Sequence, residues 1–392
     1  MLLLIRTTLA LFLAVSSAHA AEEWKAIGLS GIHYAVERSS LHPDRWRQDL
    51  QHTYDCQNPC VVEFDNRLSA VHLRYKWAQL NPEEGVYKFD DLAEVMKVIH
   101  SSGKMATLVI MAGKYTPNWV LELGARHINI PAKTSDAFSQ PYVPLPWDEI
   151  QVKSYNTLIE ELGKFIREDS ELRQTLAMVK NGLSVVHSGE TRLMPTEAFK
   201  VKVDKHNKIE NSNFQKKLCD EWASAGYSEN KILQAIRKSN NAIAKHFPDQ
   251  YIGIAYVGGS NRFPTVDNHG KCVANKKNTT INNIIKDITI SYGDRSIINN
   301  TVLTGTIGNP PIMKWVRKNG GNIAFQVNRQ IVGCKNGAKN PCSKEIFLET
   351  INEAIEAGAM FVEVHEGNIN HFKDILPELD SELKTSWERR NQ

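Results

Sequence analysis

Short apolar runs alternate with amphipathic stretches along most of the chain. Runs of the kind that form buried parallel strands, each bounded by turn-forming residues, occur at Ala26–Tyr34, Ala70–Tyr75, Met105–Met111, Gly182–His187, Tyr251–Val257, Thr301–Thr306, Asn322–Val327 and Ala359–Val364. Helical spacing of apolar residues occurs between them at Phe89–Ser101, Ile150–Asp169, Glu229–Phe247, Pro310–Asn319 and Ser343–Ala357. Repeated strand–helix units in this number predict an α/β fold, a single (β/α)8 TIM barrel with extended loops.

The main alternative is a doubly wound open sheet. The glycine-rich turn that usually follows the first strand of such a sheet is missing. No internal repeat, low-complexity run or Pro/Ser-rich linker divides the chain, so one barrel domain over residues 21–392 is the simplest interpretation. The polar, Lys/Asn-rich stretch from Thr191 to Ser228 predicts an extended loop above the fourth strand, on the face where barrel active sites lie.

Residues 1–20 have the pattern of a secretory signal peptide. Arg6 precedes the apolar run Leu9–Val15, and Ala18-His19-Ala20 has the small-x-small form of a cleavage site, so we expect cleavage after Ala20. The apolar run is too short for a comfortable membrane span. The mature protein is therefore expected to be secreted or periplasmic, with no membrane contact once the signal peptide is removed.

The composition is that of a globular protein. Hydrophobic residues make up 42% of the 392 positions, and 47 Lys+Arg balance 44 Asp+Glu. These values exclude disordered, collagen-like and multi-span membrane proteins. The near-balance of charge also does not favour nucleic acid or an anionic membrane surface as a partner.

Export would place the six cysteines in an oxidising compartment, where they form disulfides. Two close pairs enclose turn-forming residues, which favours local disulfides Cys56–Cys60 and Cys334–Cys342. Cys219 and Cys272 would then form the third. A zinc site is the alternative, but no C-x-x-C pair occurs, so we expect no metal.

The second strand–helix unit carries a more specific pattern. It reads Leu73-Arg74-Tyr75-Lys76-Trp77, followed by Asn81-Pro82-Glu83-Glu84-Gly85-Val86-Tyr87-Lys88-Phe89, and the third unit adds Thr116-Pro117-Asn118-Trp119. These segments resemble the second-strand motif and the P-x-W loop of clan A glycoside hydrolases, especially the β-galactosidase, xylanase and cellulase-like barrels. The resemblance covers about residues 70–120 and is architectural elsewhere. It implies a carbohydrate substrate, glycosidic-bond hydrolysis and no cofactor.

Clan A enzymes place an acid/base glutamate at the end of the fourth strand, and the resemblance assigns that place to Glu190. The clan usually has Asn before this residue, whereas here Gly189 precedes it. Glycoside hydrolysis needs a carboxyl group that can protonate the leaving oxygen. The structural alternative is that Glu190 caps the following loop or pairs with Arg192.

The second carboxylate departs from the clan pattern. The clan nucleophile follows the seventh strand, but no acid occurs from Arg295 to Lys344. We therefore expect the partner on the eighth strand, at Glu363, because a carboxylate in an apolar strand is costly unless it is paired or used. Glu366 is the reserve. An ion pair between Glu363 and Arg74 is the structural alternative.

Sugar binding is expected from aromatic and polar side chains at the strand ends. Trp77 and Trp119 stand in the matched motifs, whereas Trp147 fits better as a packing residue for the helix near Ile150. The resemblance implies that Arg74 holds an active-site carboxylate ionised. Further candidates that could bind sugar hydroxyls are His187, Gln326 and Asn328.

Other chemistries have less support, because no G-x-S-x-G, H-E-x-x-H or P-loop motif occurs. The prediction is a secreted glycoside hydrolase, and the alternative is a catalytically inactive barrel that binds carbohydrate. The basic stretch Arg295–Lys344 fits either an anionic sugar such as a uronate or a solvated basic face. The sequence does not indicate an oligomeric state.

Overall fold

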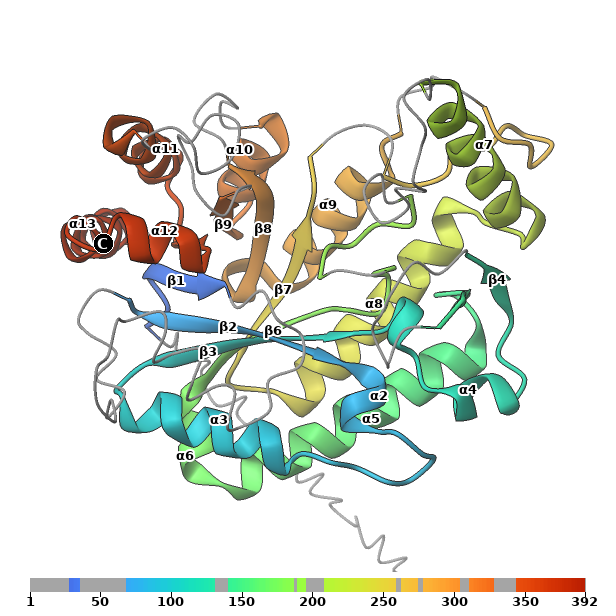
Figure 1. Ribbon diagram of the computed structural model, residues 1–392, viewed down its shortest axis with the longest axis horizontal. Helices are drawn as coiled ribbons and strands as arrows, with labels where there is room; N and C mark the ends of the chain where they lie inside the picture. Colours follow the sequence, from blue (N-terminus) through green and yellow to red (C-terminus); the bar gives the residue numbers. More distant parts are fainter. Residues whose placement is uncertain are drawn as a thin grey trace, which may run out of the picture.

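The chain folds as a closed parallel barrel surrounded by helices (Figure 1). The computed structural model describes residues 28–35, 68–130, 140–186, 189–194, 208–258, 262–273, 278–303, 310–327 and 343–391. The barrel order is β1-β10-β9-β8-β7-β6-β3-β2. The bounds are β1 Gly31–Ala35, β2 Ala70–Lys76, β3 Met105–Met111, β6 Leu176–Lys180, β7 Tyr251–Tyr256, β8 Ser296–Leu303, β9 Asn322–Val327 and β10 Phe361–Val364. This is the predicted (β/α)8 barrel.

Two of the predicted strands are displaced. The fourth strand is Leu176–Lys180, not Gly182–His187, because the apolar run that follows Lys180 leaves the ladder and packs over the end of β3. The sixth begins at Ser296, five residues before the predicted Thr301, because the two asparagines that interrupt its apolar pattern are buried within the strand. The first strand begins at Gly31, five residues after the predicted Ala26, and the remaining strands agree with their predicted bounds within two residues.

Helices cover the outside of the barrel, with α3, α5 and α6 on one side of it in Figure 1 and α13 close to β1. Their bounds are α2 Trp77–Leu80, α3 Asp90–Ser101, α4 Asn118–Glu122, α5 Glu149–Glu168, α6 Ser170–Thr175, α7 Lys208–Ser224, α8 Glu229–His246, α9 Thr280–Tyr292, α10 Pro311–Lys318, α11 Lys344–Ala357, α12 Glu366–His371 and α13 Leu376–Asn391. Short 3-10 turns lie at η1 Gly113–Tyr115 and η2 Gly293–Arg295, and β4 His127–Asn129 pairs antiparallel with β5 Tyr142–Pro144.

Helix ends follow local sequence chemistry. Asp148 begins α5 by accepting a hydrogen bond from Ile150 N, and Ser228 begins α8 by accepting one from Lys231 N. Gly358 ends α11 in the left-handed conformation that glycine adopts without strain. In the described part of the chain, no helix is long and apolar enough to span a membrane.

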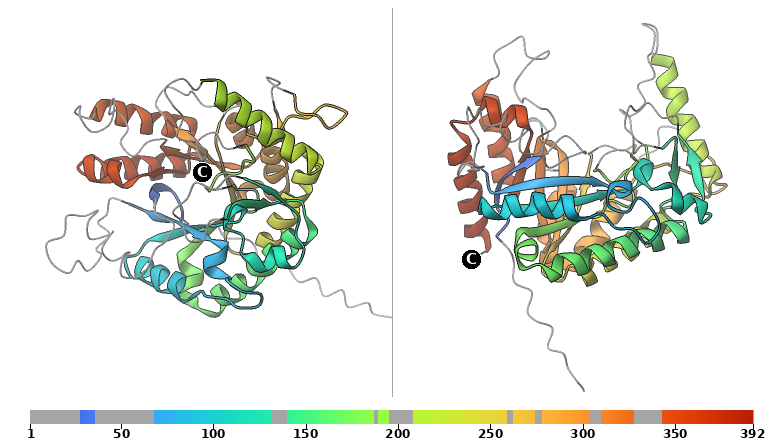
Figure 2. Two further views of the ribbon diagram at one scale, coloured as in Figure 1. Left: turned by 45° about the vertical axis from the view of Figure 1, so that its right-hand side comes forward. Right: turned by 60° about the horizontal axis from the view of Figure 1, so that its bottom comes forward.

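Helix α7 was not expected. Its residues lie in the polar stretch predicted as a loop, and that prediction is wrong for Lys208–Ser224. Two contacts hold its carboxyl-terminal half: Trp222 is fully buried and donates from Nε1 to Leu193 O at 3.0 Å, and Cys219 forms a disulfide with Cys272. The disulfide confirms the predicted third pair. The views in Figure 2 show α7 at the rim of the molecule.

The hydrophobic core has two parts. The larger lies between the outward faces of the strands and the helices. The smaller fills the amino-terminal end of the barrel interior, where Leu29, Met178, Tyr251, Ile297 and Phe361 pack together. We call this smaller cluster the interior apolar floor. Nearer the carboxyl ends of the strands the interior side chains are polar, and this is the end of the barrel where active sites form.

Candidate active site

Alternate strands contribute one layer of four inward-facing side chains: His72, Lys180, Asn299 and Glu363. In a tilted eight-stranded barrel, the residues at one height come from alternate strands. The strand that lies between two of these residues pairs with both of them, at two positions that are two residues apart. The register has this two-residue offset on each of the four intervening strands. On β3, His72 pairs with Thr107 and Lys180 with Val109, and on β7, Lys180 pairs with Gly253 and Asn299 with Ala255. On β9, Asn299 pairs with Ala324 and Glu363 with Gln326, and on β1, Glu363 pairs with His33 and His72 with Ala35. We call these four residues the polar layer.

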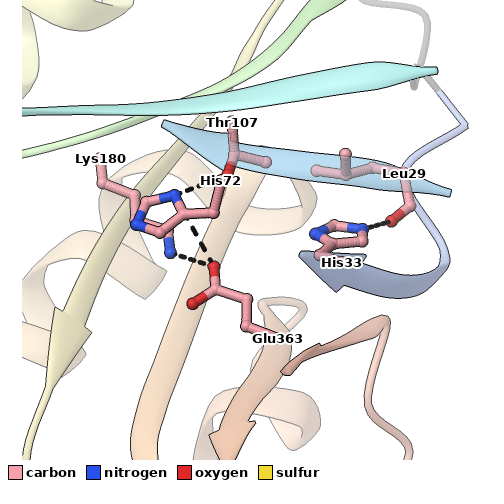
Figure 3. A network of polar contacts seen from close by, with 6 residues as sticks. All are labelled: Leu29, His33, His72, Thr107, Lys180 and Glu363. Carbon is pink, nitrogen blue, oxygen red and sulfur yellow. Dashed lines mark hydrogen bonds and ion pairs between the residues drawn. The ribbon is translucent and has the colours of Figure 1, made fainter. Parts of the chain in front are cut away.

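Three members of the polar layer contact one another (Figure 3). Lys180 Nζ donates to Glu363 Oε1, and His72 Nδ1 lies 3.9 Å from the same oxygen. His72 Nδ1 also lies 2.8 Å from Thr107 Oγ1. Lys180 and Glu363 are each about 1% exposed. The interior of the barrel therefore holds a buried ion pair whose charges cancel.

Burial sets the protonation of the basic groups. It lowers the pKa of the His72 imidazole well below its ordinary value, and the nearby Lys180 ammonium adds to the effect. Burial also lowers the pKa of Lys180, while Glu363 acts in the opposite direction. One step lower, His33 lies 2.8 Å from Leu29 O, and burial lowers its pKa to about 3. Both histidines are therefore neutral at neutral pH.

Several polar atoms of this layer and of the position next to it lack hydrogen-bond partners. Asn299 is fully buried, and neither Oδ1 nor Nδ2 has a hydrogen-bond partner among the described residues. The same holds for Glu363 Oε2 and for Gln326 Nε2, which belongs to the next position toward the strand ends. A buried polar atom that lacks a partner is costly, so these atoms mark a place suited to a further polar group.

Glu190 lies at the carboxyl end of the fourth barrel strand, although β6 itself ends earlier. Asn181 N donates to Gly253 O at 2.7 Å, and Thr191 N donates to Ala255 O, two residues further along β7, at 2.7 Å. Glu190 forms the parallel bridge with Ala255. Thr191 thus occupies the position that residue 183 would have in an uninterrupted strand. Glu190 therefore occupies the position of residue 182, which is the next inward-facing position after Lys180 toward the carboxyl end of the strand.

Close backbone contacts hold the segment between β6 and Glu190. Tyr155 on α5 donates from its hydroxyl to Ile110 O at 2.8 Å and accepts from Gly182 N at 3.2 Å. Gly182 O accepts from Ala112 N, and a Cβ on Gly182 would overlap the carbonyl of Ile110. Glycine at 182 is therefore required by the approach of this segment to β3.

The two predicted catalytic carboxylates lie at different heights. Glu190 lies at the rim with its side chain 15% exposed, and Arg192 Nη2 lies 3.6 Å from Glu190 Oε2, which is the ion pair considered as the structural alternative. Glu363 lies one repeat deeper. Its ion pair is with Lys180 and not with Arg74, the partner named in the structural alternative. Their separation in height places only Glu190 at the level of the strand ends.

Arg74 follows His72 by two residues on β2 and therefore belongs to the level of Glu190. A Cβ on Gly189 would lie 4.0 Å from Arg74 Nε and 3.5 Å from Val109 Cγ1. The arginine thus faces the backbone that leads into Glu190.

Trp77 lies differently from what sugar stacking requires. Trp77 is fully buried and packs edge-on against Trp119 and Tyr155, so its faces are covered by protein. Trp119 is partly buried and donates from Nε1 to Asn81 O at 3.2 Å. Trp147 packs against Trp222, with ring centroids 5.8 Å apart, as expected for a packing residue. Trp77 is thus a core residue in this arrangement, and Trp119 packs against it.

Several predicted residues lie outside the part of the chain that the structure describes. They are His187, Asn328 and the cysteines 56, 60, 334 and 342. Glu366 is the first residue of α12. Among the described residues, no cluster of three or more His, Cys, Asp or Glu side chains is arranged to hold a metal ion.

Sequence reasoning missed three members of the polar layer. Lys180 lies just before the run mistaken for the fourth strand, and Asn299 lies just before the run taken as the sixth. His72 lies within a correctly predicted strand, where period-two alternation with Arg74 places both on one face. That alternation was the one available signal.

No protein-family model matches the chain, and no curated protein matches it in sequence. Solved structures resemble it in fold. The catalytic domain of a β-amylase from Paenibacillus polymyxa gives a TM-score of 0.57 at 10% identity, over 92% of this chain and 100% of that one. The chain thus shares its barrel fold with this enzyme.

Two β-galactosidases are also similar in fold. The enzyme from Rahnella sp. R3 gives a TM-score of 0.53 at 11% identity, over 93% of this chain and 58% of that one. A GH42 β-galactosidase from G. stearothermophilus gives 0.52 at 13% identity, over 91% and 57%. The chain therefore spans less than two thirds of these two proteins. At such identities the likeness is one of fold.

Proposed function

We propose that the protein is a glycoside hydrolase that cleaves O-glycosidic bonds of an oligo- or polysaccharide, with Glu190 as the general acid/base. The observation that carries this proposal is the position of Glu190, which rejoins the barrel beside Ala255 at the end of the fourth strand. The fold shared with glycoside hydrolases supports it. Fold alone does not determine activity, so the proposal depends on the position of this carboxylate and not on the fold.

The reaction needs two groups. In a retaining mechanism Glu190 would protonate the oxygen of the departing sugar while the second carboxylate attacks the anomeric carbon, and Glu190 would then take a proton from the water that cleaves the glycosyl–enzyme bond. Glu363 is the proposed second carboxylate. Lys180 Nζ donates to its Oε1, while Oε2 has no hydrogen-bond partner among the described residues.

Activity of the Glu190→Gln variant tests the proposal. Wild type is expected to release sugars from a panel of polysaccharides and oligosaccharides, detected by mass spectrometry. With an unactivated leaving group, Glu190→Gln should lower turnover by about 10²–10⁴. Glu149→Gln, an exposed residue of the first turn of α5, is the matched control and should retain activity. Normal turnover by Glu190→Gln would contradict the assignment.

The depth of Glu363 favours a second candidate function. Its carboxylate is 1% exposed and is neutralised by Lys180, an arrangement that also fits a structural ion pair. In that case the barrel binds carbohydrate without cleaving it. Binding of an oligosaccharide by wild type with no product after prolonged incubation would establish this function in place of hydrolysis.

We further propose that the mature protein acts outside the cytoplasm, in the periplasm or after secretion. The signal-peptide pattern of residues 1–20 motivates this location, and the Cys219–Cys272 disulfide supports an oxidising compartment. Cell fractionation and amino-terminal sequencing test it. Recovery of the uncleaved chain in the cytoplasm would contradict it.

A further inference from the structure

Three side chains on neighbouring strands present unused hydrogen-bonding atoms to the barrel interior. Asn299 on β8, Gln326 on β9 and Glu363 on β10 are 0%, 3% and 1% exposed. Asn299 Nδ2 and Oδ1, Gln326 Nε2 and Glu363 Oε2 have no hydrogen-bond partner among the described residues. Such a concentration is unusual, because buried polar atoms are nearly always paired in native proteins.

The placement of these residues brings the atoms toward one region. Glu363 and Gln326 are direct neighbours in the β10–β9 register, and Asn299 pairs with Ala324, two residues before Gln326. Ile297, two residues before Asn299, belongs to the interior apolar floor, so alternation directs Asn299 inward as well. The small Ala255 separates Asn299 from the position of Glu190.

The chemistry of the atoms defines what they can bind. Asn299 Nδ2 and Gln326 Nε2 are donors, whereas Asn299 Oδ1 and Glu363 Oε2 are acceptors. A hydroxyl group both donates and accepts, so one or two hydroxyls would satisfy this set. A cation would face two amide donors, and a second carboxylate would face Glu363.

The charge of the region is consistent with an uncharged ligand. Lys180 and Glu363 neutralise each other through their hydrogen bond. His72 is neutral at neutral pH because burial lowers its pKa. Toward the strand ends, the next positions on β1, β3 and β7 are Ala35, Val109 and Ala255, whose short side chains fill less of the barrel interior than the layer beneath.

We propose that Asn299 and Gln326, beside the free oxygen of Glu363, form a specificity-determining subsite that binds an uncharged hydroxyl-bearing part of the sugar and rejects a carboxylate in its place. This inference rests on the proposed function. It assigns neutral sugars, and not uronates, as the substrate class. The uronate considered for the basic stretch Arg295–Lys344 is then excluded as the substrate.

Calorimetric binding of matched sugars to the mature protein tests the subsite. The probes are maltotetraose, cellotetraose, mannotetraose and β-1,4-galactotetraose, each with its C6-carboxylated counterpart, and product release is measured on the same samples. At least one neutral probe should bind at least tenfold more tightly than its carboxylated form. Asn299→Ala should weaken that binding by roughly tenfold.

Asn300→Ala is the matched control, because Asn300 is the adjacent residue, is equally buried and uses its Oδ1 to accept from Val302 N. Thermal melts of both variants identify any loss of folding. Asn299→Asp offers a second variant of nearly the same volume, which should weaken neutral-sugar binding further by placing another acid beside Glu363. Both Asn299 variants are compared at equal folded fraction.

The outcomes separate the subsite from the hydrolase. Cleavage that is unaffected by Asn299→Ala, or tighter binding of a carboxylated probe, overturns the subsite and leaves hydrolysis standing. Binding that Asn299→Ala weakens, without product from wild type, supports the subsite and overturns hydrolysis. Absence of binding to all probes overturns the subsite.

Discussion

Lys180 on β6 donates a hydrogen bond to Glu363 on β10 across the barrel interior, between residues 183 positions apart in the sequence. Strands β6 and β10 are not neighbours in the sheet, so this contact joins opposite parts of the barrel wall. Each charge is buried and depends on the other for compensation. The pair therefore couples the stability of the fold to the identity of both residues.

Replacing one partner of this pair should destabilise the protein more than replacing both. We expect Lys180→Met and Glu363→Gln each to lower the free energy of unfolding by about 3–5 kcal/mol, because each leaves an uncompensated or poorly solvated group. The double variant should lose less than the sum of the two losses. Urea denaturation measures the three values.

The exposed pair between Lys164 and Glu161 on α5 supplies the control for that cycle. Lys164→Met should change stability little, because water already solvates both charges. Additive losses at Lys180 and Glu363 would show that the two side chains do not depend on each other.

Acidification should destabilise the fold through its buried histidines. Burial lowers the pKa of His33 to about 3 and that of His72 well below 6.5, so the unfolded chain binds more protons below about pH 6.5. The free energy of unfolding should therefore fall as the pH drops below that value, by roughly 1.4 kcal/mol per pH unit for each histidine. Above pH 6.5 this contribution is constant.

Denaturant melts between pH 4.5 and 8 measure the slope. His33→Gln should make it shallower by removing one of the two titrating groups. His127→Gln, at an exposed histidine of β4, should leave the slope unchanged. Equal slopes in wild type and His33→Gln would mean that His33 is protonated within the folded barrel.

A single methyl group at Gly182 should disturb the site. Gly182→Ala would force Cβ against Ile110 O and push away the segment that leads to Glu190, so we expect a loss of at least about 2 kcal/mol together with reduced turnover. Gly258→Ala is the control, because its Cβ would lie 4.0 Å from Asn300 Oδ1, an ordinary contact. Melting and activity measurements compare the two; equal stability would show that the segment relaxes freely.

The Cys219–Cys272 disulfide should stabilise the folded chain by restricting the unfolded one. Its partners are 53 residues apart, and loop-closure entropy at that length corresponds to about 4 kcal/mol. Cys219→Ser/Cys272→Ser should lower the melting temperature accordingly and expose α7 to proteolysis. Peptide mapping of the wild type under non-reducing conditions verifies the pairing. An unchanged melting temperature would contradict the expectation.

The barrel could be predicted from sequence because each strand–helix unit carries local signals. Met105–Met111 is uniformly apolar, and Glu229–His246 repeats apolar residues at helical spacing between a serine cap and its last turn. The prediction of the fourth strand was wrong for a non-local reason. Leu176–Lys180 ends in a lysine, which is unfavourable in a buried strand unless Glu363 compensates it from β10. No local pattern contains that information.

The site was predictable in part. A positional likeness placed Glu190 at the end of the fourth strand, which the register reproduces even though the strand itself was assigned too late. Motif spacing identified Trp77 but gave no indication of which neighbours cover it, and its faces are buried. Asn299 was missed because an asparagine pair reads as a break, whereas here both asparagines lie inside β8.

The interruption after Lys180 has an evolutionary consequence. Because the chain leaves the ladder at Asn181 and returns at Thr191, the segment that carries Glu190 is an insertion between two fixed contacts with β7. Changes within it that keep the Gly182 contact with β3 are expected to leave the eight strands and their interior side chains in place. The proposed acid/base Glu190 and the proposed ligand-binding residues Asn299 and Gln326 are thus encoded in separate parts of the gene, so selection can alter one of them while preserving the others.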